Sequence, residues 1–188
     1  TIAANNDFSH FTATLGLDDA ATLRLDSPFD YADQARLFLP PGLPDPNDAE
    51  YPDQVAEALM PLITASGGGA FVLCTSYRAM DRIAERLRAE LPFPLLVQGE
   101  EGKSALIDRF AKAGNAVLVA TASFWEGVDV KGAALRLVAI DKLPFGQQGD
   151  PVFEARIKLI KERGGNAFNE LQLPRAITSL RQGVGRLI

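Results

Sequence analysis

Between residues 70 and 141, short and wholly apolar segments alternate with longer segments whose apolar residues recur every three or four positions. The short segments predict strands that are buried on both faces of a sheet. The longer segments predict amphipathic helices that cover those faces. Right-handed crossovers between such strands make the sheet mostly parallel. The alternation therefore predicts a three-layer α/β domain with a mostly parallel central sheet.

The same periodicity gives approximate bounds for each element. Strands are predicted at 70–74, 95–98, 116–120 and 135–141, and helices at about 78–91, 103–112, 151–163 and 172–188. Residues 1–69 supply a short helix at 7–17, a proline-rich connection with a strand-like stretch at 36–39, and a helix from Val55 to Ile63. A length of 188 residues predicts one domain with its core in 70–188. We expect it to be a fragment of a larger protein.

The counts of cysteine and histidine limit the metal chemistry of the chain. One cysteine, Cys74, excludes a disulfide framework or an all-cysteine cluster, and one histidine, His10, excludes a site with two histidines. No apolar run reaches the roughly 18 residues of a membrane span, and no signal-peptide pattern opens the sequence. We therefore predict no metal site, no membrane contact and a cytoplasmic location.

Charge is distributed unevenly along the sequence. The net charge is −5, but residues 1–69 carry −9 and residues 151–188 carry +4. The acidic total disfavours a general grip on nucleic acid. The basic C-terminal segment is interpreted first as solvated helix faces, and the alternative is an anionic ligand bound there.

Residues 97–104, V-Q-G-E-E-G-K-S, end like a phosphate-binding P-loop. The first glycine of that motif, which makes the tight turn, is replaced by Val97. Glu100 and Glu101 also lie where backbone N–H groups would have to hold a phosphate. We therefore interpret Lys103 as a surface lysine near the start of a helix.

The loop at 121–132, T-A-S-F-W-E-G-V-D-V-K-G, directly follows a predicted strand. Ligands of parallel sheets bind at the carboxyl ends of the strands, so this composition predicts a binding loop. The alternative is a tight turn around a buried aromatic pair.

The spacing T-x-x-x-x-x-G-x-D in this loop resembles motif V of superfamily-2 helicases, and FWEGVD resembles the DinG/YoaA-type (XPD-like) branch. VLCTSYRAM at 72–80 resembles motif IV of that branch, and QLPRAITSLRQGVGRLI at 172–188 resembles the helix of motif VI. IDKLPF at 140–145, DPVFEAR at 150–156 and SPFDY at 27–31 agree as well. The resemblance covers essentially the whole chain.

The resemblance implies the second RecA-like domain of an ATP-dependent DNA helicase that unwinds DNA 5′ to 3′ in repair or replication stress. Its partners would be single-stranded DNA and the N-terminal RecA-like domain of the same protein. That first domain would hold the P-loop, the main elements for ATP and Mg²⁺, and the 4Fe–4S cluster typical of this branch. The isolated fragment is expected to be inactive.

Site residues follow from the matched motifs. Arg186, with Gln182, matches the catalytic arginine finger of motif VI, although the second arginine of that pattern would follow Ile188. The implied nucleotide contacts are Glu126, Gly127, Asp129 and Gly185, of which Glu126 replaces an arginine of other branches. The implied nucleic-acid contacts are Ser76, Tyr77, Arg78, Thr121, Phe124 and Trp125, with core packing as the alternative for Phe124 and Trp125.

A second hypothesis is a non-catalytic RecA-like module that binds a protein partner through its acidic N-terminal third. A small-molecule nucleotide enzyme would need a glycine-rich loop after the first strand, and residues 75–79 lack one.

Overall fold

The computed structural model describes residues 8–17, 19–26, 29–121, 124, 130, 132–146, 149–185 and 187. The chain forms two compact units. The sheet unit comprises Tyr31–Lys142 and the residues after Gln182, and the helical unit comprises the residues up to Asp30 and Leu143–Gln182.

The centre of the sheet unit is a sheet of four parallel strands in the order β2-β3-β1-β4. Ala70 of β1 lies opposite Val117 of β3 on one side and opposite Leu137 of β4 on the other. This arrangement confirms the predicted α/β fold with a parallel sheet. The strands are β1 (Ala70–Cys74), β2 (Leu95–Val97), β3 (Val117–Thr121) and β4 (Leu137–Ile140).

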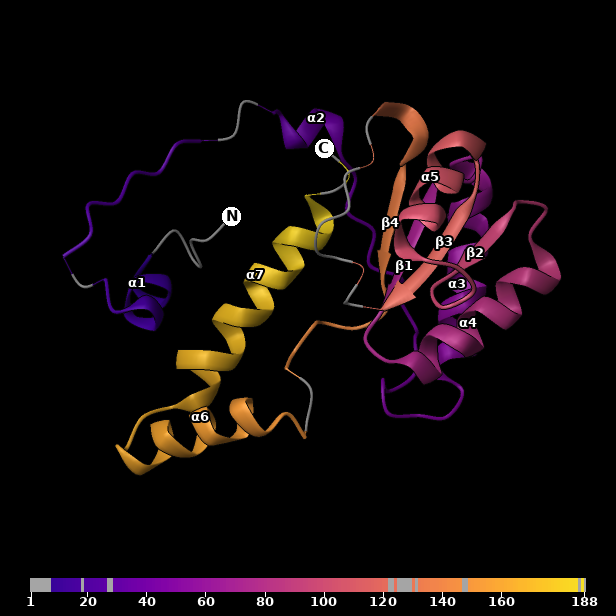
Figure 1. Ribbon diagram of the computed structural model, residues 1–188. Helices are drawn as coiled ribbons and strands as arrows, with labels where there is room; N and C mark the ends of the chain where they lie inside the picture. Colours follow the sequence, from indigo (N-terminus) through magenta and orange to yellow (C-terminus); the bar gives the residue numbers. More distant parts are fainter. Residues whose placement is uncertain are drawn as a thin grey trace. The chain divides into compact units, whose positions relative to one another are not determined.

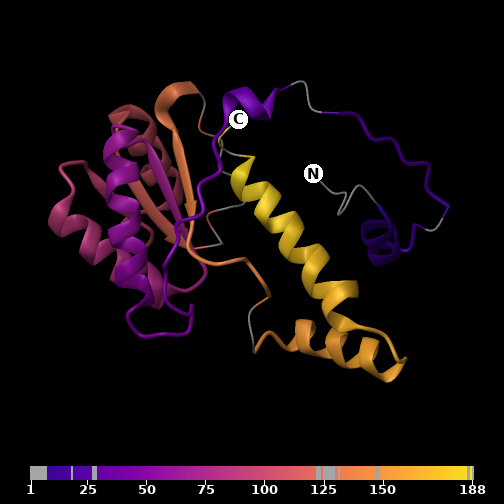
Figure 2. The same ribbon diagram turned by 180° about the vertical axis from the view of Figure 1, so that it is seen from behind.

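Helices cover both faces of the sheet, as the alternating pattern predicts. On one face, α3 (Tyr51–Ala65) and α4 (Tyr77–Glu90) pack against alternate side chains of β1 and β3. On the opposite face, α5 (Lys103–Ala113) buries Leu106 and Phe110 against Phe71 and its neighbours. Helix α3 lies behind the strands in Figure 1 and in front of them in Figure 2.

Glycines 67–69 make the tight entry into β1. Gly68 has φ +75°, and a methyl group on its Cα would collide with the backbone carbonyl of Asn115. Gly69 has φ +63°, and a methyl group there would meet the Arg136 guanidinium. Only glycine permits both the positive φ and the close backbone approach at these positions.

Arg136 joins the loops at the amino ends of the strands. Its guanidinium donates to the carbonyls of Ser66 at 2.7 Å, Gly67 at 2.8 Å, Ala133 at 2.6 Å and Gly114 at 3.0 Å. β4 begins at Leu137, where its pairing with β1 starts, rather than at the predicted residue 135.

The helical unit contains α1 (Ser9–Leu15), α6 (Pro151–Glu162), a π-helical turn η3 (Phe168–Gln172) and, up to Gln182, helix α7 (Leu173–Val184). Asp150 caps α6 by accepting hydrogen bonds from the N–H groups of Val152 at 2.9 Å and Phe153 at 3.2 Å. Phe153, Ile160, Ala167 and Leu171 form its small core. Helix α7 ends at Val184, earlier than the predicted residue 188. Gly183 and Gly185 lie on either side of this end, and glycine disfavours helix.

One strand prediction is wrong. Residues 36–39 are not a strand, and Leu37, Phe38 and Leu39 are exposed. The prolines at 40 and 41 follow this stretch and have no N–H to donate to a neighbouring strand. The short helix α2 (Tyr31–Gln34) precedes it.

Candidate functional site

Polar side chains follow each strand at the carboxyl edge of the sheet. Thr75 and Ser76 follow β1, Gln98 follows β2, Thr121 ends β3 and Asp141 follows β4. Because all four strands are parallel, these residues lie along one edge, which is where ligands bind to sheets of this kind.

The side chain of Gln98 connects two of the predicted nucleic-acid contacts. Its Oε1 accepts hydrogen bonds from the Thr121 N–H at 2.7 Å and from the Thr121 hydroxyl at 3.0 Å. Its Nε2 donates to the Tyr77 hydroxyl at 3.3 Å. The carboxamide therefore fixes Thr121 and leaves the proton of the Tyr77 hydroxyl available to a ligand.

Thr121 is buried at this edge, with only 6% of the residue exposed. A hydroxyl has one proton, and Thr121 donates that proton to Gln98. In this arrangement the hydroxyl cannot donate a hydrogen bond to a phosphate.

Ser76, Tyr77 and Arg78 begin α4 on the exposed side of the edge. The Ser76 hydroxyl caps the helix by accepting a hydrogen bond from the Ala79 N–H at 3.2 Å. Tyr77 is 60% exposed, and Arg78 is exposed as well. This turn therefore presents hydroxyl groups, an aromatic ring and a cation to solvent.

Asp141 is the buried charged group of the edge, with only 8% of the residue exposed. It accepts hydrogen bonds from the Thr75 N–H at 2.9 Å and from the Thr75 hydroxyl at 3.3 Å. Burial raises the pKa of the Asp141 carboxyl, and the hydrogen bonds from Thr75 and from the Lys142 N–H oppose that rise. Asp141 therefore links the ends of β1 and β4.

Contacts with Tyr51 and Pro46, which lie outside the sheet, also hold the segment that follows β4. The Tyr51 hydroxyl donates to the backbone carbonyl of Asp141 at 2.5 Å. The Lys142 ammonium donates to the Pro46 carbonyl and lies 4.9 Å from the centre of the Tyr51 ring. Burial, followed by the nearby Asp141 charge, raises the pKa of Tyr51, so the hydroxyl remains a donor.

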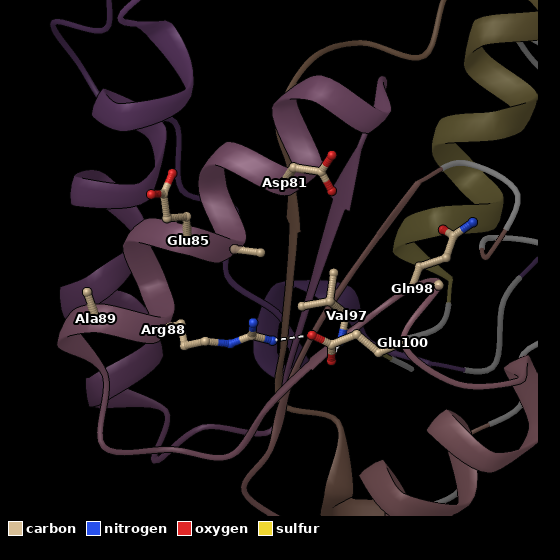
Figure 3. A pocket seen from close by; sticks show the side chains of 9 residues that line it. Asp81, Glu85, Arg88, Ala89, Val97, Gln98 and Glu100 are labelled. Carbon is tan, nitrogen blue, oxygen red and sulfur yellow. Dashed lines mark hydrogen bonds and ion pairs between the residues drawn. The ribbon is translucent and has the colours of Figure 1, made fainter.

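A groove of about 480 Å³ lies beside this edge, between α4 and the loop after β2 (Figure 3). Arg88 crosses it and pairs with Glu100 at 2.5 Å. Asp81 and Glu85 add two further carboxylates to the lining, so the groove is acidic and unsuited to phosphate. It is lined by Asp81, Ala84, Glu85, Arg88, Ala89, Val97, Gln98, Gly99 and Glu100.

In the loop that resembles a P-loop, the carboxylates of Glu100 and Glu101 bind groups of the protein itself. The Glu100 side chain accepts the Val97 N–H at 3.3 Å, and Glu101 pairs with Arg109. Lys103 is the first residue of α5 and is exposed, and its ammonium lies 5.2 Å from the centre of the Phe124 ring. The interpretation of Lys103 as a surface lysine at a helix start is confirmed.

The remaining predicted residues divide into two groups. Phe124 lies in the core that α5 covers, with 6% exposure, so its ring packs there rather than being presented to solvent for stacking. Gln182 is half-buried near the end of α7, and Gly185 is exposed just after it. Five predicted site residues lie outside the described residues: Trp125, Glu126, Gly127, Asp129 and Arg186.

Two residues of the edge, Gln98 and Asp141, were not among the predicted contacts. Each is the last residue of a predicted strand, and that position was the available signal. Their hydrogen-bond partners lie 23 and 66 residues away in the sequence, so no local pattern could assign them a role.

Neither a metal-binding cluster nor a membrane-spanning helix occurs in the described part of the chain. No group of three or more His, Cys, Asp or Glu side chains among them could hold a metal ion. No helix in the described part of the chain is both long and apolar enough to cross a membrane.

The chain is similar in sequence to a known family and to several of its members. Residues 59–188 match the family described as helicase C-terminal domain. The whole chain is 50% identical to the ATP-dependent DNA helicase YoaA of Escherichia coli, and 88% of it is covered at 38% identity by the ATP-dependent helicase DinG of Mycobacterium tuberculosis. The chain spans 30% of the length of the former and 25% of the latter.

A solved structure titled XPD helicase has a similar fold. It matches 75% of this chain and 26% of its own chain, with a TM-score of 0.58 and 15% sequence identity. This match supports the RecA-like architecture of the parallel sheet.

Proposed function

The chain belongs to the family of helicase C-terminal domains, and from this premise we propose that it is the second motor domain of an ATP-dependent DNA helicase. The observation that carries the proposal is the polar edge at the carboxyl ends of four parallel strands. The similarity of the chain to YoaA and DinG helicases supports DNA as the nucleic acid.

Single-stranded DNA is proposed to contact the start of α4. The Ser76 hydroxyl and the Arg78 guanidinium would bind phosphate, and Tyr77 would offer either its ring or its hydroxyl proton. Thr121 would support this turn from behind through Gln98, because its own hydroxyl proton is engaged there. Such contacts are local, so they do not require a positive net charge on the chain.

ATP is proposed to bind between this domain and the first RecA-like domain, which would supply the P-loop and the Mg²⁺ ligands. Arg186 would reach the γ-phosphate, where a guanidinium stabilises charge in the transition state by about 10³–10⁵ in rate. Gln182, Gly185, Glu126, Gly127 and Asp129 would complete the nucleotide contacts. The isolated domain would then be inactive.

We extend the proposal to 5′-to-3′ unwinding of DNA during repair or replication stress, on the resemblance alone. An iron–sulfur cluster of the complete protein would be held by the first domain, because four cysteine ligands are needed and this chain has one. Burial in β1, followed by the charges of Asp141 and Asp81, raises the pKa of the Cys74 thiol, so it is a poor ligand.

The test is an Arg186→Ala substitution in the full-length protein. We expect ATP turnover to fall by at least about 10³-fold, as for loss of an arginine finger, while binding of single-stranded DNA is retained. Lys112→Ala, which removes an exposed cation at the end of α5, is the matched control and should leave turnover unchanged. Normal turnover in Arg186→Ala would show that Arg186 is not the arginine finger.

A further inference from the structure

Two exposed phenylalanines lie against each other in the helical unit. The ring centroids of Phe145 and Phe168 are 5.8 Å apart, and their planes are inclined by 34°. Phe145 is 41% exposed and Phe168 is 47% exposed, so each retains a large apolar surface in solvent. Neither residue belongs to the small core of this unit.

The surrounding backbone holds both rings in place. The Phe145 N–H donates to the Leu143 carbonyl at 2.8 Å, and the Phe168 N–H donates to the Asn166 side chain at 3.0 Å. Gly146 lies directly on the ring of the buried Phe153, since a methyl group at Gly146 would collide with that ring. These contacts hold the backbone on which both rings are mounted.

Cations accompany the aromatic pair in the same unit. The Arg175 guanidinium lies 5.3 Å from the centre of the Phe153 ring, so a positive charge lies over the ring that packs against Gly146. Arg163 pairs with Glu170, and Lys158 pairs with Glu162. Among the described residues, the cations without a carboxylate partner within ion-pair distance include Arg156, Lys161 and Arg175.

We propose that Phe145 and Phe168 form a base-stacking platform for single-stranded DNA, with Arg175, which lies over the Phe153 ring next to Gly146, as the nearby cation. Aromatic faces beside positive charge are the combination that binds single strands without sequence preference. A purely apolar partner would not need the cations, and a folded polyanion would not need the rings. The proposal rests on the proposed function, because it adds a second DNA contact to the same protein.

The experiment measures binding of two labelled 20-nucleotide probes, oligo(dT) and an abasic oligomer with the same phosphates, to the full-length protein. The test variants are Phe145→Leu and Phe168→Leu, which retain an apolar side chain but lose the π-face. Phe38→Leu is the matched control, because Phe38 is 56% exposed and belongs to the sheet unit. Phe145→Trp changes the side chain but retains an aromatic face.

We expect each test variant to bind oligo(dT) about tenfold more weakly, the loss of one stacked base, with unchanged affinity for the abasic probe. Phe145→Trp and Phe38→Leu should bind like the unsubstituted protein. If a leucine variant also melts at a lower temperature, recovery of affinity in Phe145→Trp still identifies stacking.

Unchanged affinity for oligo(dT) in a variant that carries both Phe145→Leu and Phe168→Leu would overturn the platform. Equal loss for both probes would overturn it as well, because the rings would then act through packing. Failure of the unsubstituted protein to bind oligo(dT) at all would instead overturn the proposed function, so the two failures are distinguishable.

Discussion

Asp141 combines burial with a structural role at the edge of the sheet. Its carboxylate receives hydrogen bonds from Thr75, and its backbone carbonyl receives one from Tyr51. A carboxylate in such a place is costly to ionise, and hydrogen bonds from neighbouring residues offset part of that cost. Asp141 is therefore the residue whose ionisation should most affect the stability of this edge.

Asp141→Asn should change how stability depends on pH. Because the pKa of Asp141 is raised in the folded protein, the folded state binds the proton more tightly, and the contribution of Asp141 to the free energy of unfolding falls as pH rises. The fall should begin near the ordinary value of 3.8 and end above the raised pKa. The carboxamide of the variant cannot ionise, so the variant should gain stability relative to the wild type across this window.

Urea unfolding at several pH values measures this difference. Parallel stability curves for the two proteins across the window would contradict the prediction. A variant that lost relative stability as pH rises would show that the ionised carboxylate is favoured by its hydrogen bonds.

Gln98 provides a second prediction at the scale of a single residue. Gln98→Leu removes the acceptor of the buried Thr121 N–H, and an unpaired buried donor costs about 1–3 kcal/mol of unfolding free energy. Gln98→Glu keeps that acceptor and should retain more stability. It should nevertheless bind single-stranded DNA more weakly, because it places a negative charge beside the proposed phosphate contacts.

Chemical denaturation and DNA binding by the full-length protein separate these effects. Gln54→Leu, at an exposed position on α3, is the control and should change stability by no more than about 0.5 kcal/mol. Equal stability of Gln98→Leu and the wild type would contradict the assigned role of the carboxamide.

At the scale of elements, the first turn of α4 has a capping role and a proposed binding role. Ser76→Ala should cost about 1 kcal/mol of unfolding free energy, since the Ala79 N–H loses its acceptor. Ser76→Asp keeps the cap but repels phosphate, so it should remain stable and bind DNA more weakly. Thermal unfolding and DNA titration measure the two outcomes, and Ser76→Thr should preserve both. Tight DNA binding by Ser76→Asp would rule out phosphate at this turn.

The main helices and strands could be predicted, although not all of their exact bounds, because local patterns determine them. The apolar run of β1, the spacing of Met80, Ile83 and Leu87 in α4, and the capping pair Asp150–Pro151 of α6 are all readable from neighbouring residues. The stretch at 36–39 was predicted wrongly, since an apolar run also needs a neighbouring strand. Sequence pattern alone does not reveal whether that neighbour exists.

The candidate site was less predictable than the fold. Gln98 meets Thr121 because β2 pairs with β3, and Asp141 meets Thr75 because β4 pairs with β1, so their roles depend on strand order. Phe124 was predicted as either a stacking or a packing residue, and its burial follows from the position of α5. Such contacts belong to tertiary structure and have no signature in the local sequence.

At the scale of the whole molecule, the net charge of −5 conceals the basic segment at 151–188. DNA binding by the full-length protein should therefore weaken as salt rises, despite the acidic character of this chain. Each phosphate contact in single-stranded DNA contributes about −0.7 to the slope of log affinity against log salt concentration. Lys161→Gln should flatten this slope by about that amount, if Lys161 contacts one phosphate.

Lys112→Gln, which removes an exposed lysine from α5 in the sheet unit, serves as the control for Lys161→Gln. Its salt dependence should equal that of the wild type. Identical slopes for all three proteins would remove Lys161 from the DNA contacts.

The Glu100 carboxylate has a consequence for self-association. β2 is an outer strand of the sheet, and its Val97 N–H is occupied by Glu100, which Arg88 holds in place. An outer strand with free backbone groups is a template on which another chain can add a strand and begin aggregation. The Arg88–Glu100 pair thus acts as a gatekeeper that closes this end of β2 to intermolecular strand addition.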